Sequence, residues 1–515
     1  MTGAVFLLNH EEYAICSEMV RLFFGQCRRK DNHLLFPYDS TPAGLATSPR
    51  IEIMIDPAVD SAYLRTLRYK TAYAPEEIEP LTRIQIRVEA ERRYGASCRT
   101  SLVELRRKLK MILYHVLQEW TGTSFPWGSL SGVRPTQICA ELMAKYGEQR
   151  AHEILLRDYR LLPDKARLGI EVAKREQAIL SQYNTDGFVV YCGLPFCPTR
   201  CSYCSFTTCD AMRYENLLPD YVEAVIKEAK TVFRRWRRGS AAAVYFGGGT
   251  PTCLPTGLFE RYIKGLLGYI PHDSASELTM EAGRPDTLDR RKLELIKEHG
   301  FTRLCINPQT MHDASLQRIG RRHTVADTLK AYHSARDFGF KSINMDLIFG
   351  LPDEPVSAFV TSLEQVLALA PESITLHSLA LKHSSRLLAE FQAEGVLSDI
   401  QPDPELAAGL ERAYGILRAA GYLPYYLYKQ KRSRGALENT GFALPGHESA
   451  YNVLMMSDRR TVIGLGSGST SKFCDGTNII RQHNSKDLGD YISRADEFAC
   501  RKVALFLQAN SDRDS

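Results

Sequence analysis

The sequence predicts an α/β protein built around a partial (β/α)6 barrel, with a helix-rich α+β domain before it and an α+β domain after it. Two observations support this prediction. Six short apolar segments alternate with amphipathic segments between residues 187 and 380, as in parallel βαβ units. Residues 1–180 and 381–515 do not continue this alternation, and 515 residues suffice for two to four domains.

Residues 1–180 are predicted to form an accessory N-terminal domain. The segments AVFLLN and IEIMID suit strands, and from Ser101 apolar residues recur at helical spacing. In PTQICAELMAKYG, Pro135 suits the first turn of a helix and Gly147 suits its end. We therefore expect more helix than strand here.

Residues 187–380 are predicted to form the barrel. Its strand candidates are GFVVYCG from Gly187, AAVYFGG from Ala242, ELTMEAG from Glu277, FTRLCIN from Phe301, SINMDLIFG from Ser342 and SITLHSLA from Ser373. Between the first two, the segment from Asp220 to Trp236 has one apolar stripe, as a helix packed on a sheet requires. In such barrels the chemistry takes place at the carboxyl ends of the strands.

Residues 381–515 are predicted to form a C-terminal domain that covers the substrate. We expect a helix near residues 407–420, a tyrosine-rich strand GYLPYYLYKQ from Gly421, and a hairpin formed by YNVLMM, SDRR and TVIGLG from Tyr451.

The composition is that of an ordinary globular protein, with 44% hydrophobic and 24% charged residues. A formal charge of +5 is too small to indicate a nucleic-acid partner. The sequence contains no apolar run of about 18 residues, and its first residues do not resemble a signal peptide. We expect a cytoplasmic protein without membrane contact, whose cysteines are reduced.

Five of the thirteen cysteines fall within eighteen residues, at Cys192, Cys197, Cys201, Cys204 and Cys209. The three central ones have the spacing C-x3-C-x2-C and follow the first predicted strand. Three thiolates on one short loop can hold a cube-shaped iron–sulfur cluster and leave one iron open to a ligand. A zinc site completed by Cys192 or Cys209 is the alternative.

The segment Cys197-x3-Cys201-x-Tyr203-Cys204 resembles the signature of radical S-adenosylmethionine (SAM) enzymes. The resemblance implies a radical SAM barrel and a [4Fe–4S] cluster on the three cysteines. Its open iron would bind the amino and carboxylate groups of SAM, which is cleaved to a 5′-deoxyadenosyl radical. The segment FGGGTP from Phe246 resembles the glycine motif that receives the SAM amino group, which implies contacts at Gly248, Gly249 and Thr250.

Over about residues 187–475 the sequence resembles the oxygen-independent coproporphyrinogen III oxidase family. Its motifs MEAGRP, NPQT, IGRRH and NMDLIFGLP imply further SAM contacts. Glu281 would be the acidic residue that contacts SAM, Gln309 would bind its ribose, Asp346 the ribose hydroxyls and Arg321 the carboxylate. Tyr191, Tyr203 and Phe206 are also expected to bind the cofactors. The residue types suit these ligand groups, because an arginine binds a carboxylate bidentately and a carboxylate accepts from hydroxyls.

The front domain and the segments SLALK, PYYLYKQK and LGSGSTSK resemble the HemZ-type coproporphyrinogen dehydrogenases. This resemblance implies the oxidative decarboxylation of two propionates of coproporphyrinogen III, giving protoporphyrinogen IX in haem biosynthesis. It also implies a flavodoxin- or ferredoxin-type electron donor.

Two alternatives stay open at this point. Phe206 stands where the best-characterised branch has a further cysteine, and it resembles the HemW branch of haem-binding carriers. The haem motif H-N-x-x-Y-W of that branch corresponds here to HESAYN, which keeps His447 and Tyr451 and suggests a tetrapyrrole contact at His447. The alternatives are a HemW-like haem carrier and another radical SAM reaction on a tetrapyrrole, such as anaerobic haem degradation.

Two weaker patterns complete the prediction. Lys429, Lys431, Arg432 and Arg434 suit a solvated face, or else a clamp for propionate groups together with Lys382 and Arg386. The series Gly464-x-Gly466-x-Gly468 lacks the helix start of a dinucleotide loop. It is better explained by a tight hairpin end or by close approach to a substrate.

Overall fold

The computed structural model describes residues 2–8, 13–24, 27–30, 33–37, 50–57, 69–71, 83–90, 98–184, 187–204, 209–236, 239–382, 385–393, 401–474 and 479–511.

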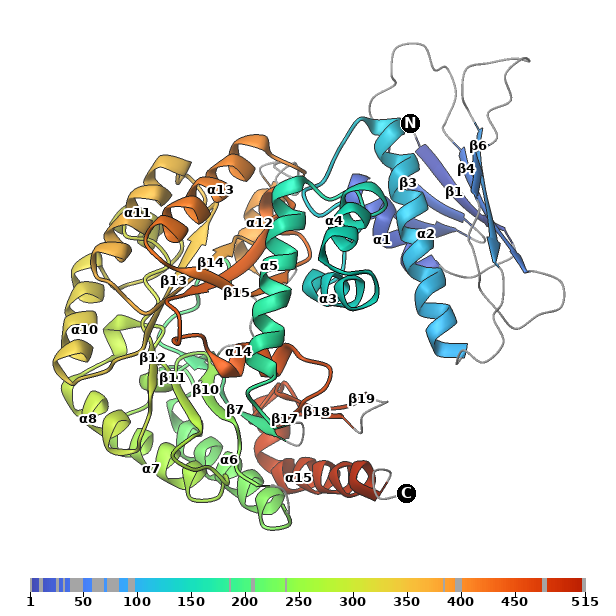
Figure 1. Cartoon of the computed structure of the whole chain (residues 1–515). Coiled ribbons are helices and arrows are strands. Elements are labelled where there is room, and N and C mark those ends of the chain that lie inside the picture. The colour runs from blue at the N-terminus through green and yellow to red at the C-terminus, as the bar shows by residue number, and fades with distance from the viewer. Residues whose placement is uncertain are drawn as a thin grey trace, which may run out of the picture.

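The first part of the chain forms a six-stranded sheet with two helices beside it (Figure 1). The strand order is β2-β3-β1-β4-β6-β5. The bounds are β1 Thr2–Leu8, α1 Tyr13–Phe24, β2 Arg28–Lys30, β3 His33–Pro37, β4 Arg50–Pro57, β5 Tyr69–Thr71, β6 Arg83–Ala90 and α2 Cys98–Thr121. Met19 and Phe23 of α1 share a small core with Leu109 and Leu113 of α2. The predicted strands AVFLLN and IEIMID and the helix from Ser101 are confirmed.

Three helices lead from this sheet to the barrel: α3 Pro135–Tyr146, α4 Glu148–Arg157 and α5 Pro163–Leu180. Pro135 begins α3, and Gly147 follows its last residue with φ +79°, as predicted. A buried ion pair joins this part to the barrel sheet, since Lys165 Nζ lies 2.6 Å from Glu438 Oε1 and Trp127 Nε1 donates to Glu438 Oε2 at 2.7 Å.

The six predicted barrel strands all exist, and they run parallel to one another. Their bounds are β7 Phe188–Leu194, β10 Ala243–Gly248, β11 Glu277–Glu281, β12 Arg303–Cys305, β13 Ile343–Phe349 and β14 Ser373–Ser378. The alternating pattern predicts them because a parallel strand needs a crossover helix before its neighbour can pair. The chain closes both edges of this sheet with its C-terminal segments.

At the β14 edge, β16 Glu438–Ala443 and then β15 Leu423–Lys429 pair antiparallel. At the β7 edge, β17 Thr461–Leu465 adds a parallel strand, followed by antiparallel β18 Thr470–Cys474 and β19 Ile479–His483. Residues 381–515 therefore extend the barrel sheet itself on both sides, and the division into three domains stays a prediction.

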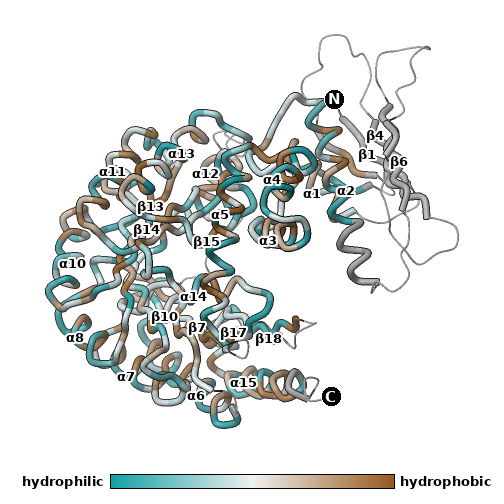
Figure 2. Tube along the Cα trace, viewed as in Figure 1, coloured by the Kyte–Doolittle hydropathy of each residue, from teal (hydrophilic) through white to brown (hydrophobic). Residues whose placement is uncertain are grey.

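Helices surround the outer face of the barrel (Figure 1). They are α6 Leu218–Phe233, α7 Thr256–Leu267, α8 Arg290–Glu298, α10 Val325–Asp337, α11 Val356–Ala368 and α13 Pro404–Ala419. The C-terminal helix α15 Leu488–Ser511 packs on α6. Helices α9 Asp313–Arg318 and α12 Arg386–Ala393 instead share a small core with Ile348 near the end of β13. The predicted apolar stripe of α6 is buried. Figure 2 shows polar and apolar residues alternating along these helices. Across the described residues, no helix combines the length and the apolar character needed to cross a membrane.

One predicted hairpin is wrong. The segment YNVLMM forms helix α14, Ala450–Met456, and only TVIGLG is a strand. The start of α14 is fixed by Glu277, whose carboxylate accepts from Ser449 Oγ at 2.9 Å and from the backbone N–H groups of Ala450 and Tyr451 at 2.9 and 3.0 Å. A carboxylate at a helix N-terminus stabilises the helix, and this contact is invisible in the local sequence pattern.

Candidate functional site

The three central cysteines lie on the loop that follows β7. Cys197 ends the short strand β8 (Phe196–Cys197), which pairs with β9 (Cys209–Asp210). Burial raises the pKa of the Cys197 thiol to about 12, with smaller contributions from the thiols of Cys204 and Cys201. These three side chains are therefore close enough to influence one another, at the carboxyl end of the barrel strands.

The loop that carries the three cysteines makes hydrogen bonds with three other segments of the chain. Ser202 N donates to Ile319 O at 3.0 Å, and Leu387 N donates to Ser202 O at 3.0 Å. Arg284 is buried, and its Nη1 donates to Thr199 Oγ1 at 2.9 Å. The loop is thus positioned by the segments that follow β11 and α9 and by the start of α12.

The zinc alternative has little geometric support. Among the residues that the structure describes, no three His, Cys, Asp or Glu side chains gather around a point that one metal ion could occupy. Cys192 is buried in the helix-facing core, and Glu228 of α6 adds to the large increase that burial causes in its pKa. A single zinc ion needs all its ligands about 2.3 Å away, whereas each thiolate of a cubane binds its own iron.

The glycine motif brings the end of β10 against the backbone that carries Cys197. Gly249 N donates to Leu194 O at 2.7 Å, and Thr250 N donates to Phe196 O at 2.7 Å. A Cβ on Gly249 would lie 2.3 Å from Phe196 O, and Gly248 has φ +115°. Thr250 Oγ1 is 3.5 Å from Cys197 Sγ. Glycine is required here by close approach and not by an ordinary turn.

The carboxyl groups of Glu281 and Asp346 interact inside the barrel, and their pKa values are shifted in opposite directions from the ordinary values. Burial and then Asp346 raise the pKa of Glu281 to about 8. Burial would also raise the pKa of Asp346, but the contacts with His377 and Asn344 hold it below its ordinary value. These opposite shifts favour the protonated form of Glu281 and the ionised form of Asp346, a pairing typical of functional sites.

Arg321 is buried beside the cysteine loop. Its Nη1 donates to Gly283 O at 2.9 Å and to Asn307 O at 2.8 Å, and its Nη2 donates to Tyr203 Oη at 3.2 Å. Within the described part of the chain, Arg321 Nε and Asn307 Oδ1 are buried without a hydrogen-bond partner. Unsatisfied buried polar atoms are costly, so these atoms fit a polar ligand such as the amino-acid part of SAM.

Gln309 occupies a strained position. Its φ is +70°, in the left-handed region that costs a residue with a side chain about 1–3 kcal/mol. The backbone of Gln309 pairs with β13, since its N–H donates to Asp346 O at 2.9 Å and its carbonyl accepts from Ile348 N at 2.8 Å. This pairing places Gln309 next to Asp346, as the motif predicts.

Tyr191 lies inside the barrel, where its ring stacks on those of Tyr245 and Tyr451 at 6.3 and 6.5 Å between centroids. Tyr203 lies beside Arg321, and Phe206 lies outside the described residues. The contacts above join the other predicted residues into one region, while their binding roles stay predictions.

Sequence reasoning missed three residues of this interior: Tyr245, Cys305 and His377. Tyr245 Oη is 3.9 Å from Cys305 Sγ, and His377 Nε2 is 3.4 Å from Asp346 Oδ2. The alternation of side chains along a strand could have predicted them. Tyr245 lies opposite Tyr191, Cys305 lies opposite Glu281, and His377 lies opposite Ile348 of the motif NMDLIFGLP.

The structure places His447 at the other end of the barrel from the cysteines. Because β16 runs antiparallel to β14, with Ala443 opposite Ser373, the chain leaves β16 at the amino ends of the barrel strands. Arg303, the first residue of β12, donates from Nη1 to His447 O at 2.7 Å. His447 is therefore remote from the cysteine loop, and its suggested tetrapyrrole contact stays a prediction.

Two residues of the basic segment 429–434 bind backbone carbonyl groups of other segments. Lys429 Nζ donates to Leu130 O at 2.7 Å and lies 5.9 Å from the Trp127 ring, while Arg434 Nη1 donates to Gly350 O at 2.9 Å. Neither side chain is on an open solvated face, because β15, which ends at Lys429, is covered by α3 and α5, and Arg434 is held against the end of β13. The glycine series ends a hairpin, as predicted, with Gly466 at φ +95° between β17 and β18.

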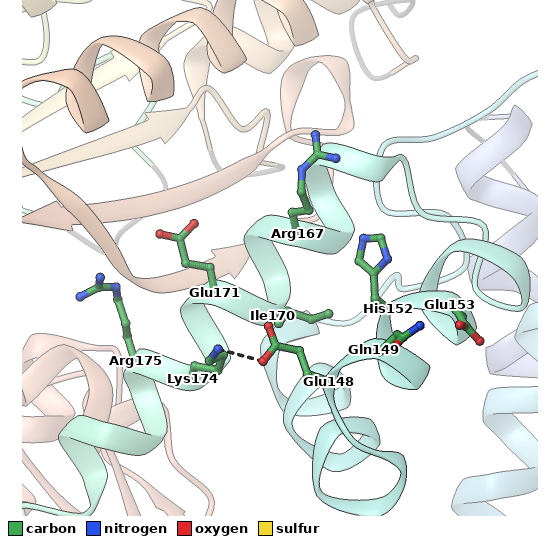
Figure 3. Close-up of a pocket in the computed structure, with 9 residues that line it drawn as sticks. All are labelled: Glu148, Gln149, His152, Glu153, Arg167, Ile170, Glu171, Lys174 and Arg175. Carbon is green, nitrogen blue, oxygen red and sulfur yellow. Dashed lines mark hydrogen bonds and ion pairs between the residues drawn. The ribbon is translucent and has the colours of Figure 1, made fainter.

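A pocket of about 900 Å³ lies between α4 and α5, on the outer surface (Figure 3). It is lined by Glu148, Gln149, His152, Glu153, Arg167, Ile170, Glu171, Lys174 and Arg175. Its charges are partly paired, with Lys174 Nζ 2.8 Å from Glu148 Oε2. None of the predicted site residues lines it.

Comparison with known proteins places this site in a family. Residues 191–366 match the model of the radical SAM superfamily. The chain is 34% identical over 414 residues to the oxygen-independent coproporphyrinogen-III oxidase-like protein HemZ of Bacillus subtilis, covering 79% of this chain and 82% of the relative. It is 28% identical to the haem chaperone HemW of the same organism, over 59% of this chain and 75% of HemW.

Among solved structures, coproporphyrinogen III oxidase (HemN) from Escherichia coli matches with a TM-score of 0.49 and 23% identity, over 64% of this chain and 73% of HemN. The chain belongs to the radical SAM superfamily, whose cofactors are a [4Fe–4S] cluster and SAM, and within it to the oxygen-independent coproporphyrinogen-III oxidase-like family of HemZ.

Proposed function

We propose that this protein oxidatively decarboxylates two propionate side chains of coproporphyrinogen III to vinyl groups, giving protoporphyrinogen IX. The observation that carries the proposal is the interior described above, where three clustered thiols, a buried arginine with an unsatisfied Nε and two unlike carboxylates lie together. The 34% identity to HemZ over 79% of the chain supports the choice of substrate.

In this proposal Cys197, Cys201 and Cys204 hold the cluster, and Arg321, Glu281, Gln309 and Asp346 orient SAM. When bound, the cluster and SAM supply the abstraction of a hydrogen atom from the β-carbon of a propionate. The bond to the carboxylate carbon then breaks, carbon dioxide leaves, a vinyl group forms, and one electron passes to a one-electron acceptor. Tyr191 and the two tyrosines stacked on it would help to keep water from the reacting atoms.

Two cationic side chains follow β14 and suit the propionates that do not react. Lys382 is half-buried, and burial lowers the pKa of its ammonium group. Arg386 begins α12, and its Nη2 donates to Arg200 O at 2.5 Å, beside the cysteine loop. A buried carboxylate without a partner is expensive, so cations are needed near the entrance. A flavodoxin- or ferredoxin-type protein would reduce the cluster.

The test is anaerobic incubation of the reconstituted protein with SAM, dithionite and coproporphyrinogen III. We expect carbon dioxide and protoporphyrinogen IX, with two SAM consumed per tetrapyrrole. A Cys201→Ala variant removes a cluster ligand and should lose SAM cleavage. Persistence of SAM cleavage in that variant would refute the assignment of the cluster.

The similarity to HemW favours a second function, that of a haem carrier with a SAM site. The same preparation distinguishes the two. Stoichiometric, stable haem binding without any conversion of coproporphyrinogen III would support the carrier and refute the decarboxylase, and conversion of haem itself would indicate another radical SAM reaction on a tetrapyrrole.

A further inference from the structure

A row of four polar side chains crosses the inner wall of the barrel from β13 to the end of β15. Asp346 Oδ2 is 3.4 Å from His377 Nε2, and His377 Nδ1 is 3.3 Å from Tyr428 Oη. Gln430 Nε2 donates to Tyr428 Oη at 3.4 Å. The His377 and Asp346 side chains are 24% and 18% exposed, so both line the interior instead of packing away in the core.

The strand register explains why these residues meet. Asp346 pairs with Thr375 and Ile348 pairs with His377, so His377 is the diagonal neighbour of Asp346 on the same face of the sheet. Beyond β14, the antiparallel strand β16 places Asn439 opposite Tyr428 of β15. The Asn439 side chain is fully buried, accepts from Ser378 N at 3.0 Å and donates to Tyr428 O at 3.3 Å, so it ties the backbones of β14 and β15 together.

The hydrogen bonds of this row run in one direction. The Gln430 amide nitrogen can only donate, so Tyr428 Oη accepts from it and has its own proton to offer to His377 Nδ1. The proton of a neutral His377 is then on Nε2, from which it is donated to Asp346. Tyr428 therefore selects the histidine tautomer, as second partners of functional histidines do.

Asp346 is held from its other side too. Asn344 Nδ2 donates to Asp346 Oδ1 at 2.7 Å, and Thr375 Oγ1 donates to Asn344 Oδ1 at 3.2 Å. The Thr375 hydroxyl also helps to stabilise the charged Asp346 carboxylate. Each carboxylate oxygen thus has a fixed donor and still has lone pairs to spare. This arrangement suits an acceptor that must point its free lone pairs at a ligand in the barrel.

We propose that His377 is a positioning residue, which orients the Asp346 carboxylate toward the hydroxyl groups of SAM while Tyr428 fixes the tautomer of His377. The inference rests on the SAM contact of Asp346 in the proposed function and is independent of the tetrapyrrole. It deepens that function by naming what makes Asp346 a selective hydroxyl acceptor.

The test measures ligand binding to the reconstituted cluster, by the change of its electron paramagnetic resonance signal during titration with SAM or with methionine. Methionine has the same amino and carboxylate groups as SAM but no ribose hydroxyls. In a His377→Phe variant the dissociation constant for SAM should rise about tenfold, the effect of losing one hydrogen bond to a charged group, while that for methionine is unchanged. His377→Gln keeps a donor and should recover most of the affinity.

Two further variants make the test independent of folding. Tyr428→Phe leaves His377 in place but no longer fixes which of its ring nitrogens is protonated. This variant should raise the dissociation constant for SAM by a few-fold. In Asp346→Asn, adding His377→Phe should cause no further loss, because the histidine acts through that carboxylate. An unchanged SAM affinity in His377→Phe, or an equal loss of methionine affinity, would overturn the proposal. Failure to convert coproporphyrinogen III would not affect these results.

Discussion

A methyl group at Gly249 should dislodge the cysteine loop. The Cβ of Gly249→Ala would lie 2.3 Å from Phe196 O and 2.7 Å from its carbonyl carbon, closer than the 3.0 Å that real Cβ atoms respect. Both contacts are backbone atoms, so relief requires β10 and β8 to separate by at least about 0.7 Å. Overpacking of this kind costs about 1–3 kcal/mol.

The separation would also lengthen two backbone hydrogen bonds of 2.7 Å, from Gly249 N and Thr250 N, each with a net value of about 1 kcal/mol. We expect the free energy of unfolding to fall by about 2–4 kcal/mol. The strain would act at Phe196, the residue before Cys197. The variant should therefore bind less iron and sulfide after anaerobic reconstitution, and should unfold at a lower temperature.

The matched control is Gly257→Ala. Gly257 is in the first turn of α7, is exposed, and has nothing within 4 Å of an added Cβ. Alanine favours a helix over glycine by about 1 kcal/mol, so this variant should be as stable as the parent or more so. If Gly249→Ala binds as much iron as Gly257→Ala and unfolds at the same temperature, the close-approach argument is refuted.

Two further predictions concern buried charges. The pKa of Glu281 in the folded, SAM-free protein is raised to about 8, so the folded state keeps a proton that the unfolded state releases near pH 4.5, and stability should fall by up to about 1.4 kcal/mol per pH unit between these values. Urea unfolding from pH 5.5 to 8 should show a smaller slope for Glu281→Gln, and equal slopes would contradict the assignment. Lys502→Met should cost about 3–5 kcal/mol, because it leaves Glu228 charged in a site where both side chains are fully buried. Adding Glu228→Gln should restore much of that loss in the same unfolding assay, and a double variant as unstable as Lys502→Met would show that the charge is not the cause.

Local patterns predicted a large part of the barrel. The six strands, the apolar stripe of α6, and the bounds of α3 at Pro135 and Gly147 follow from periodicity and from helix start and stop residues, which act within a few residues of the chain. The cysteine and glycine motifs indicated the radical SAM family and its cofactors, because they consist of a few residue types at short spacing, while the binding roles of their residues stay predictions.

Long-range contacts decided the rest. The Glu277 carboxylate stabilises the start of the helix formed by YNVLMM, and it is 172 residues away from Ser449 in the sequence. A local sequence pattern contains no information about such a contact. The antiparallel course of β16 placed His447 at the far end of the barrel, and Lys429 turned to the front helices instead of to solvent.

The sequence by itself therefore determined the fold class through backbone periodicity, and it indicated the cofactors through the resemblance of its cysteine and glycine motifs to the radical SAM signature, because both are local properties of the chain. Only the tertiary structure decided how Asp346, His377 and Tyr428 meet on three strands, and how residues 381–515 complete both edges of the sheet. The physical reason is that strand register and the pairing of buried charges join residues far apart in the chain, where their energies depend on the whole fold.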